Sequence, residues 1–125
     1  MTRVLITLAA TTLLGSAAGA LAQPRAWVAP RSADARQNPL PNESQILAGG
    51  KKLYQQRCSV CHGEDGGGTN RGRDLVISRV QSQSDGALFW KISSGNTRTG
   101  MPTFSFLPEG QRWQLVMYLR TLARE

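Results

Sequence analysis

Cys58-Ser59-Val60-Cys61-His62 places two thiols three positions apart and an imidazole directly after the second thiol. This spacing is typical of covalent attachment of a c-type haem, in which each thiol adds to one vinyl group of the porphyrin. The histidine that follows is then in reach of the iron as its proximal ligand. The chain has two cysteines and one histidine, and all three lie in this pentapeptide. The motif therefore predicts one haem c, bound through Cys58 and Cys61 and ligated by His62.

Three other uses of a Cys-x-x-Cys pair are weaker interpretations. A redox disulfide of the thioredoxin type needs a surrounding βαβ pattern, and the sequence around the motif has none. Half of a zinc site needs a second pair of ligands, and the chain has no other cysteine or histidine. A structural disulfide across two residues closes a loop that is too small to stabilise much. Haem attachment explains both thiols and the imidazole together.

Residues 1–22 have the pattern of an export signal. Arg3 supplies the positive start, residues 4–14 the apolar run and residues 20–22 the small-residue cleavage site. An uncleaved membrane anchor is the alternative, because no charge occurs between Arg3 and Arg25. However, the strongly apolar part is shorter than the roughly 20 residues that a membrane-spanning helix needs. We expect cleavage and a periplasmic location, with membrane association only if the segment stays uncleaved.

The chain is strongly basic. Fifteen Lys and Arg stand against eight Asp and Glu, a formal net charge of +7. Removal of residues 1–22 takes away Arg3 alone, which leaves 14 basic and 8 acidic residues, or +6 before haem propionates are counted. For an exported haem protein we expect redox protein partners with acidic docking surfaces, where charge acts mainly on the association rate. We expect neither nucleic acid nor a small-molecule substrate; general solubility is the alternative explanation of the charge.

Residues 23–42 read as a linker that precedes a single domain over residues 43–125. This segment contains four prolines and three arginines and shows no apolar periodicity. Such a composition predicts a flexible or extended chain. Its one aromatic residue, Trp27, is isolated, and we assign the segment no function.

The domain is expected to consist of helices. The first is predicted over residues 43–57, with Asn42 and Gln45 as a capping-box-like pair at its start. Gly49 and Gly50 lie inside it, although each glycine costs about 1 kcal/mol relative to alanine in a helix. We therefore infer that another helix crosses closely at this point.

Two further helices complete the prediction. The helix over residues 84–94 has Ser84 as its N-cap and Gly95 as its stop. The last helix runs from about 108 to 123 and carries an apolar stripe at positions i, i+3, i+4 and i+7: Leu115, Tyr118, Leu119 and Leu122. The predicted fold class is all-α, with three to four short helices wrapped around one covalently bound haem.

The sixth iron ligand must come from a methionine, because no second histidine exists. Met101 and Met117 remain once the signal is removed. Met117 lies inside a predicted helix, where methionine usually fills the core. Met101 lies in a loop between Gly100, which lets the chain turn, and Pro102, which stiffens it. We therefore predict Met101 as the second metal ligand.

Together these residues resemble the class I c-type cytochromes, the small bacterial monohaem cytochromes c. The resemblance spans residues 43–123, all of the predicted domain. It rests on the first helix with the haem motif, on the methionine loop and on the last helix: Gly50-Lys51-Lys52-Leu53-Tyr54, Cys58 to His62, Gly72-x-Asp74-Leu75, Gly100-Met101-Pro102 and Leu115 to Arg120. It implies that the first helix crosses the last one near Gly50.

The chain departs from that family at Arg73, which stands where many members have proline. In the family the carbonyl of this residue accepts a hydrogen bond from the proximal imidazole. Any residue has a carbonyl, so the bond itself is compatible with arginine, while its rigidity is in question. As haem propionate partners we predict Trp90 and Arg98, with Arg73 and Arg79 as weaker candidates.

Iron held by His62 and Met101 has both axial positions filled by protein, which suits transfer of one electron rather than conversion of a substrate. We therefore expect a periplasmic single-electron carrier between larger redox proteins, and not an enzyme. One alternative is a haem subunit fixed in a dehydrogenase or oxidase complex. A peroxidase or gas-binding haem protein is the other, and it requires Met101 to leave the iron.

Overall fold

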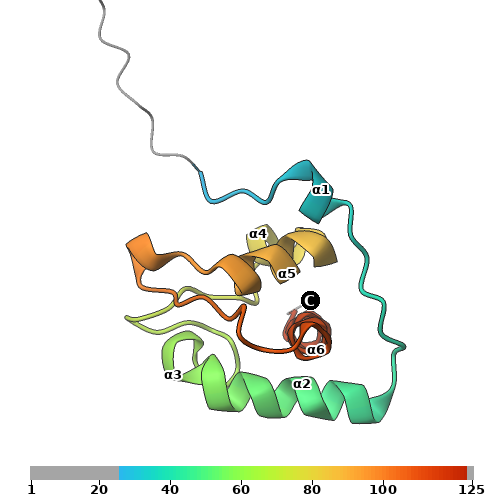
Figure 1. The fold of residues 1–125 in the computed structure, drawn as a ribbon. Coiled ribbons are helices and arrows are strands. Elements are labelled where there is room, and N and C mark those ends of the chain that lie inside the picture. The colour runs from blue at the N-terminus through green and yellow to red at the C-terminus, as the bar shows by residue number, and fades with distance from the viewer. Residues whose placement is uncertain (1–25, 124–125) are drawn as a thin grey trace, which may run out of the picture.

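The structure is a computed structural model that describes residues 26–123, and the described chain is helical (Figure 1). Its frame consists of α2 (Ser44–Arg57), α5 (Asp85–Ser94) and α6 (Glu109–Thr121). Four elements of three or four residues complete it: α1 (Arg31–Asp34), α3 (Ser59–His62), α4 (Ser78–Gln81) and the 3₁₀ helix η1 (Thr97–Thr99). The all-α prediction is confirmed. The number of helices exceeds three to four because single turns leave no apolar period in a sequence.

The predicted signal segment, residues 1–22, lies outside the described residues. Of the helices within residues 26–123, none is both long and apolar enough to cross a membrane.

Helices α2 and α6 cross in direct backbone contact at Gly50, as the sequence predicted. A Cβ atom at Gly50 would lie 2.8 Å from the carbonyl carbon of Gln114 and 3.0 Å from Cβ of Tyr118. One turn further on, the rings of Tyr54 and Tyr118 meet with their centroids 5.2 Å apart. The glycine is therefore required for the close approach, and the approach brings two buried tyrosines together.

The hydrophobic core lies between α2, α5 and α6. Its largest fully buried side chains are Tyr54, Trp113, Leu115 and Val116. The ring of Phe89 from α5 stacks on Trp113 of α6, with centroids 4.0 Å apart and planes 21° from parallel. This stacked pair joins the middle of α5 to the start of α6.

The helix ends agree with the sequence at α5 and differ at α2. Ser84 Oγ accepts the N–H of Ala87 at 3.0 Å, and Gly95 ends the helix with φ of 63°. At α2 the N-cap residue is Glu43, and no side chain caps the helix, so the predicted Asn42–Gln45 capping pair is wrong. Asn42 lies one residue too early to reach the first free N–H groups.

Residues 27–40, called the strap below, pass over α5 and then descend to the start of α2 (Figure 1). Apart from α1 they form no helix. Their side chains nevertheless contact the domain. Ser84 donates to the Asp34 carboxylate at 2.6 Å, and the Asn38 amide donates to the Trp113 carbonyl at 3.0 Å. Proline content predicts the form of this backbone but does not reveal these contacts.

Candidate haem-binding site

The cysteine motif forms one helical turn at the end of α2. Cys58 ends that helix with its N–H donating to the Tyr54 carbonyl at 2.8 Å. The N–H of His62 then donates to the Cys58 carbonyl at 2.9 Å, which closes the turn of α3. Residues at i, i+3 and i+4 of a turn share one side. The local fold therefore groups both thiols and the imidazole, as haem attachment requires.

Both thiols are free, so the pair is not a disulfide in this structure. Burial raises the pKa of the Cys58 thiol to about 11, and the neighbouring Cys61 adds to the shift. The free thiol is therefore protonated at neutral pH. Among residues 26–123 no group of three or more His, Cys, Asp or Glu side chains could hold a metal ion by itself. The zinc interpretation thus lacks further ligands in the part of the chain that the structure describes.

The His62 ring is oriented by a backbone hydrogen bond. Its Nδ1 lies 2.7 Å from the carbonyl oxygen of Arg73. With Nδ1–H donating to that carbonyl, Nε2 carries the lone pair that binds a metal. The family-type hydrogen bond is therefore compatible with arginine at this position.

The loop after His62 lies against the motif at close range. A Cβ atom at Gly72 would lie 2.6 Å from the Cys61 carbonyl oxygen and 3.0 Å from Cys61 Cβ. The Tyr54 hydroxyl donates to the Gly63 carbonyl at 2.7 Å, which ties the loop to α2. Burial raises the pKa of the Tyr54 hydroxyl above its ordinary range, so it stays a donor. Sequence reasoning placed Tyr54 in the helix contact but missed this bond, because nothing in the local pattern indicates it.

Met101 lies in a tight loop that leaves the C-terminal end of α5. The chain turns at Gly100, whose φ of 87° is left-handed. Asn96 and Met101 pair on either side of the turn. The Asn96 N–H donates to the Met101 carbonyl at 2.9 Å, and the Met101 N–H donates to the Asn96 carbonyl at 3.0 Å. The pairing fixes the loop at the residue that carries the thioether.

The two halves of the site come together at one end of the molecule. Cys58 and Met101 are both partly buried against the same hydrophobic core. The guanidinium of Arg57, one residue before Cys58, lies 5.8 Å from the ring centroid of Phe106, just beyond the methionine loop. In Figure 1, α2 and α5 both end on the left, where α3 and η1 lie. The contact between Arg57 and Phe106 was not predicted from the sequence.

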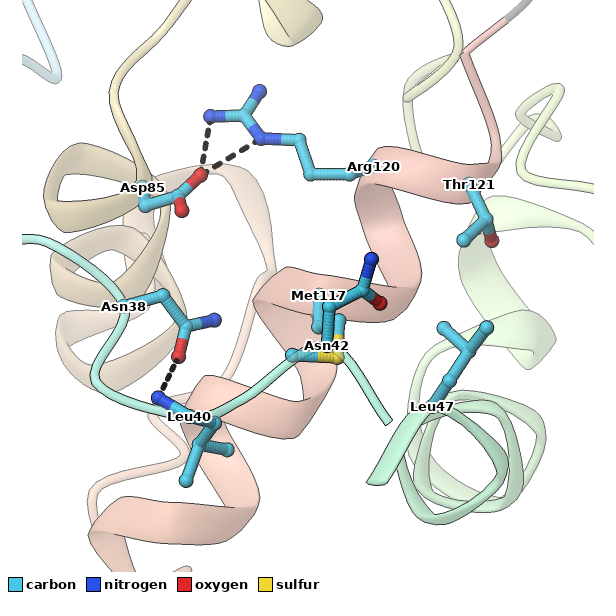
Figure 2. Close-up of a pocket in the computed structure, with 8 residues that line it drawn as sticks. All are labelled: Asn38, Leu40, Asn42, Leu47, Asp85, Met117, Arg120 and Thr121. Atoms are coloured by element: carbon cyan, nitrogen blue, oxygen red, sulfur yellow. Dashed lines mark hydrogen bonds and ion pairs between the residues drawn. The ribbon is translucent and has the colours of Figure 1, made fainter. Parts of the chain in front are cut away.

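Met117 lies elsewhere. It lines an open pocket of about 410 Å³ with Leu40 and Asn42 from the N-terminal segment and Leu47 from the first turn of α2 (Figure 2). Leu47 is eleven residues before Cys58, which is roughly 16 Å along a helix that rises about 1.5 Å per residue. Met117 is thus placed at the opposite end of α2 from the cysteine motif.

The predicted propionate partners occupy different settings. Trp90 is half-buried on α5, whereas Arg98 is exposed in η1, three residues before Met101. The carbonyl of Arg73 receives the histidine bond, and its side chain is exposed. A role of Trp90 or Arg98 toward a propionate stays a prediction.

The residues fit a covalently bound haem. Two unpaired thiols and an imidazole share one turn, and the imidazole has its Nδ1 occupied and its Nε2 available. A helical fold with this turn and a methionine loop on the same core defines a c-type cytochrome domain.

Comparison with known proteins gives the same class. Residues 45–119 match the family model described as "Cytochrome C oxidase, cbb3-type, subunit III", and the chain belongs to this family of c-type cytochrome domains. A solved structure, "KustC0563 c-type cytochrome", is 31% identical, with a TM-score of 0.55. The similarity covers 60% of this chain and 98% of that one. No curated protein sequence gives a significant match. Membership implies haem-based electron transfer with redox protein partners.

Proposed function

We propose that the chain is an exported single-electron carrier with one haem c, bound through Cys58 and Cys61 and ligated by His62 and Met101. Haem c bound there supplies an iron that gains and loses one electron. The observation that carries this proposal is the pair of fixed ligand positions. His62 is oriented by the Arg73 carbonyl, and the Met101 loop is closed by its two bonds with Asn96.

Each ligand has a separate task. The bond from His62 Nδ1 to a carbonyl increases the basicity of Nε2 and keeps the ring from rotating. The Met101 thioether is a soft ligand that favours the ferrous state and so raises the reduction potential. With iron held by both His62 and Met101, no ligand position would be left for a substrate, which favours a carrier over an enzyme.

Carbon monoxide tests this proposal directly. The reduced protein should bind carbon monoxide slowly at neutral pH, because Met101 must leave before the gas can enter. Met101→Ala should bind it rapidly, while Met117→Ala, the matched control at the far end of α2, should behave like wild type. Rapid binding by the wild-type protein would instead support a gas-binding or peroxidase function.

The partner is proposed to be a redox protein with an acidic docking surface. Exposed arginines flank the haem motif on both sides, with Arg57 before it and Arg71 and Arg73 in the loop held against it. Positive charge around the electron-transfer site increases the rate of encounter with an anionic partner. The periplasm is the proposed location, and we expect the mature chain to begin at Gln23, which N-terminal sequencing would check.

A second candidate is a haem subunit fixed in an oxidase or dehydrogenase complex. The family description, which names an oxidase subunit, favours it. Size-exclusion chromatography of a mildly solubilised native extract separates the two cases. A free carrier elutes as a small haem protein, whereas a fixed subunit elutes with a large complex.

A further inference from the structure

We propose that the strap positions the Met101 loop, acting through α5. The inference rests in part on the proposed function, in which Met101 is an iron ligand. The strap lies outside residues 45–119, which match the family model. It would make residues 27–40 a determinant of how readily the methionine leaves the iron.

The strap occupies a place that α5 leaves open for it. Gly86 lies in the first turn of α5, and a Cβ atom there would collide with the carbonyl oxygen of Ala33 and lie 2.6 Å from that of Arg36. Beside it, Ser84 caps α5 while donating to Asp34 of the strap at 2.6 Å. A glycine is otherwise unfavourable in a helix, so its presence here fits the seating of the strap.

The same segment holds α5 against α6. The Arg36 guanidinium lies 4.7 Å from the Phe89 ring centroid and 5.2 Å from that of Trp113, and so covers the stacked pair. Arg36 also forms an ion pair with Glu109 at the start of α6. Asn38 then donates to the Trp113 carbonyl at 3.0 Å. The strap therefore fixes both helices that flank the Phe89–Trp113 stack.

The methionine loop is fastened to the other end of α5. The N–H of Phe104 donates to the Ile92 carbonyl at 3.1 Å, and the Thr103 hydroxyl donates to the Ser93 carbonyl at 2.6 Å. At Gly95 a Cβ atom would lie 2.5 Å from the carbonyl oxygen of Pro102. The loop thus rests on the last turn of α5 through the three residues that directly follow Met101.

Phe89 links the two ends. Arg112 of α6 also lies over this ring, with its guanidinium 4.7 Å from the centroid. Arg112 donates to the Ser93 hydroxyl and to the Leu107 carbonyl. It therefore connects the C-terminal end of α5 to the chain that follows Met101. The strap and the methionine loop therefore both contact one short helix, and Arg36 of the strap and Arg112 of α6 both lie over its Phe89 ring. Loss of the strap should loosen the loop through these packed groups.

Gly86→Ala in the full-length holoprotein tests the inference. Alanine has a higher helix propensity than glycine, but its methyl group would displace the strap. The two effects on the stability of α5 therefore have opposite signs. Gly110→Ala is the matched control, because a Cβ atom there meets nothing within 4 Å. A second variant, Asp34→Ala with Arg36→Met, cuts strap contacts without changing α5. Loop opening is read by hydrogen exchange of the Asn96 and Phe104 amides in the reduced protein, and ligand loss by carbon monoxide binding.

We expect Gly86→Ala and the strap variant each to accelerate exchange of both amides about tenfold, with Gly110→Ala unchanged. Carbon monoxide binding should accelerate in parallel. Combining the two variants should add little, because each of them releases the same segment from α5. The inference would be overturned if Gly86→Ala left the exchange of both amides unchanged. It would also be overturned if the effects of the two variants on exchange were fully additive. If exchange responds while wild type already binds carbon monoxide rapidly, the ligand assignment of Met101 fails and the positioning by the strap stands.

Discussion

The imidazole Nδ1 of His62 lies 2.7 Å from the carbonyl oxygen of Arg73, eleven residues further along the chain. The acceptor is a backbone atom, so the bond does not depend on the arginine side chain. The loop that carries it is held close to the motif by Gly72, where even a methyl group would collide with Cys61. Orientation of the proximal ligand is therefore a property of this loop as a whole.

Arg73→Ala should keep the bond between His62 and residue 73. The carbonyl remains, so we expect the NMR signal of the His62 Nδ1 proton in the reduced protein to stay protected from exchange. Arg73→Gly is the comparison, because glycine loosens the backbone by roughly 0.5–1 kcal/mol and should expose the proton. Loss of the signal in Arg73→Ala would mean that the side chain, rather than the backbone, holds the ring.

Gly50→Ala should destabilise the holoprotein by about 1–3 kcal/mol in spite of the higher helix propensity of alanine. The new methyl group would meet the backbone of Gln114 and Cβ of Tyr118, which cannot move without separating α2 from α6. Urea unfolding of the ferric protein measures the change.

Gly49→Ala is the control for this variant. Its methyl group would meet only the end of the Gln114 side chain, with Nε2 at 2.8 Å, and that side chain can rotate away. We expect stability close to that of wild type. Equal effects of the two substitutions would show that helix propensity, and not the crossing, sets the energy at both positions.

The Tyr54 hydroxyl should make stability dependent on alkaline pH. Burial raises its pKa above the ordinary value of 10.0, so the folded state holds this proton more tightly than the unfolded chain does. The contribution is fully present below pH 10 and is lost as the pH rises toward the folded pKa. Tyr54→Phe should lose about 1 kcal/mol at pH 7 with the bond to Gly63, and its stability should fall less above pH 10. Parallel pH profiles for both proteins would refute this assignment.

Electron exchange with small reagents should report the positive charge around the haem motif. We expect oxidation by the anionic reagent hexacyanoferrate to slow as ionic strength rises, because salt screens the attraction. Oxidation by a cationic cobalt complex should accelerate over the same range. Arg57→Glu combined with Arg71→Glu should flatten both dependences, whereas Arg31→Glu on the strap should change them little. Identical salt dependence for reagents of opposite charge would argue against electrostatic steering.

The sequence predicted those parts of the fold whose causes are local. Ser84 and Gly95 mark the two ends of α5, because a cap or a left-handed turn depends on the type of a single residue. Gly50 indicated the helix crossing, because glycine is costly inside a helix. The predicted Asn42 cap was wrong because α2 begins at Ser44, one residue later than the sequence pattern indicated. The spacing of Cys58, Cys61 and His62 at i, i+3 and i+4 likewise agrees with the helical turn that these residues form.

Contacts between distant residues were not predictable in this way. Arg36 and Glu109 are separated by 73 positions, and no sequence pattern around either residue predicts its partner. The same holds for Arg57 and Phe106, which lie next to the haem motif and the methionine loop, respectively. One signal for the strap was present in the sequence: Gly86, a glycine in the first turn of a helix with no local reason for being there.

The most direct test of the central claim is the absorption spectrum of the purified holoprotein in both redox states, with and without Met101. We predict a c-type haem spectrum in which the ferric form shows the weak near-infrared band of sulfur bound to iron. That band should vanish in Met101→Ala and persist in Met117→Ala. A colourless protein, or a band that survives the loss of Met101, would contradict the account.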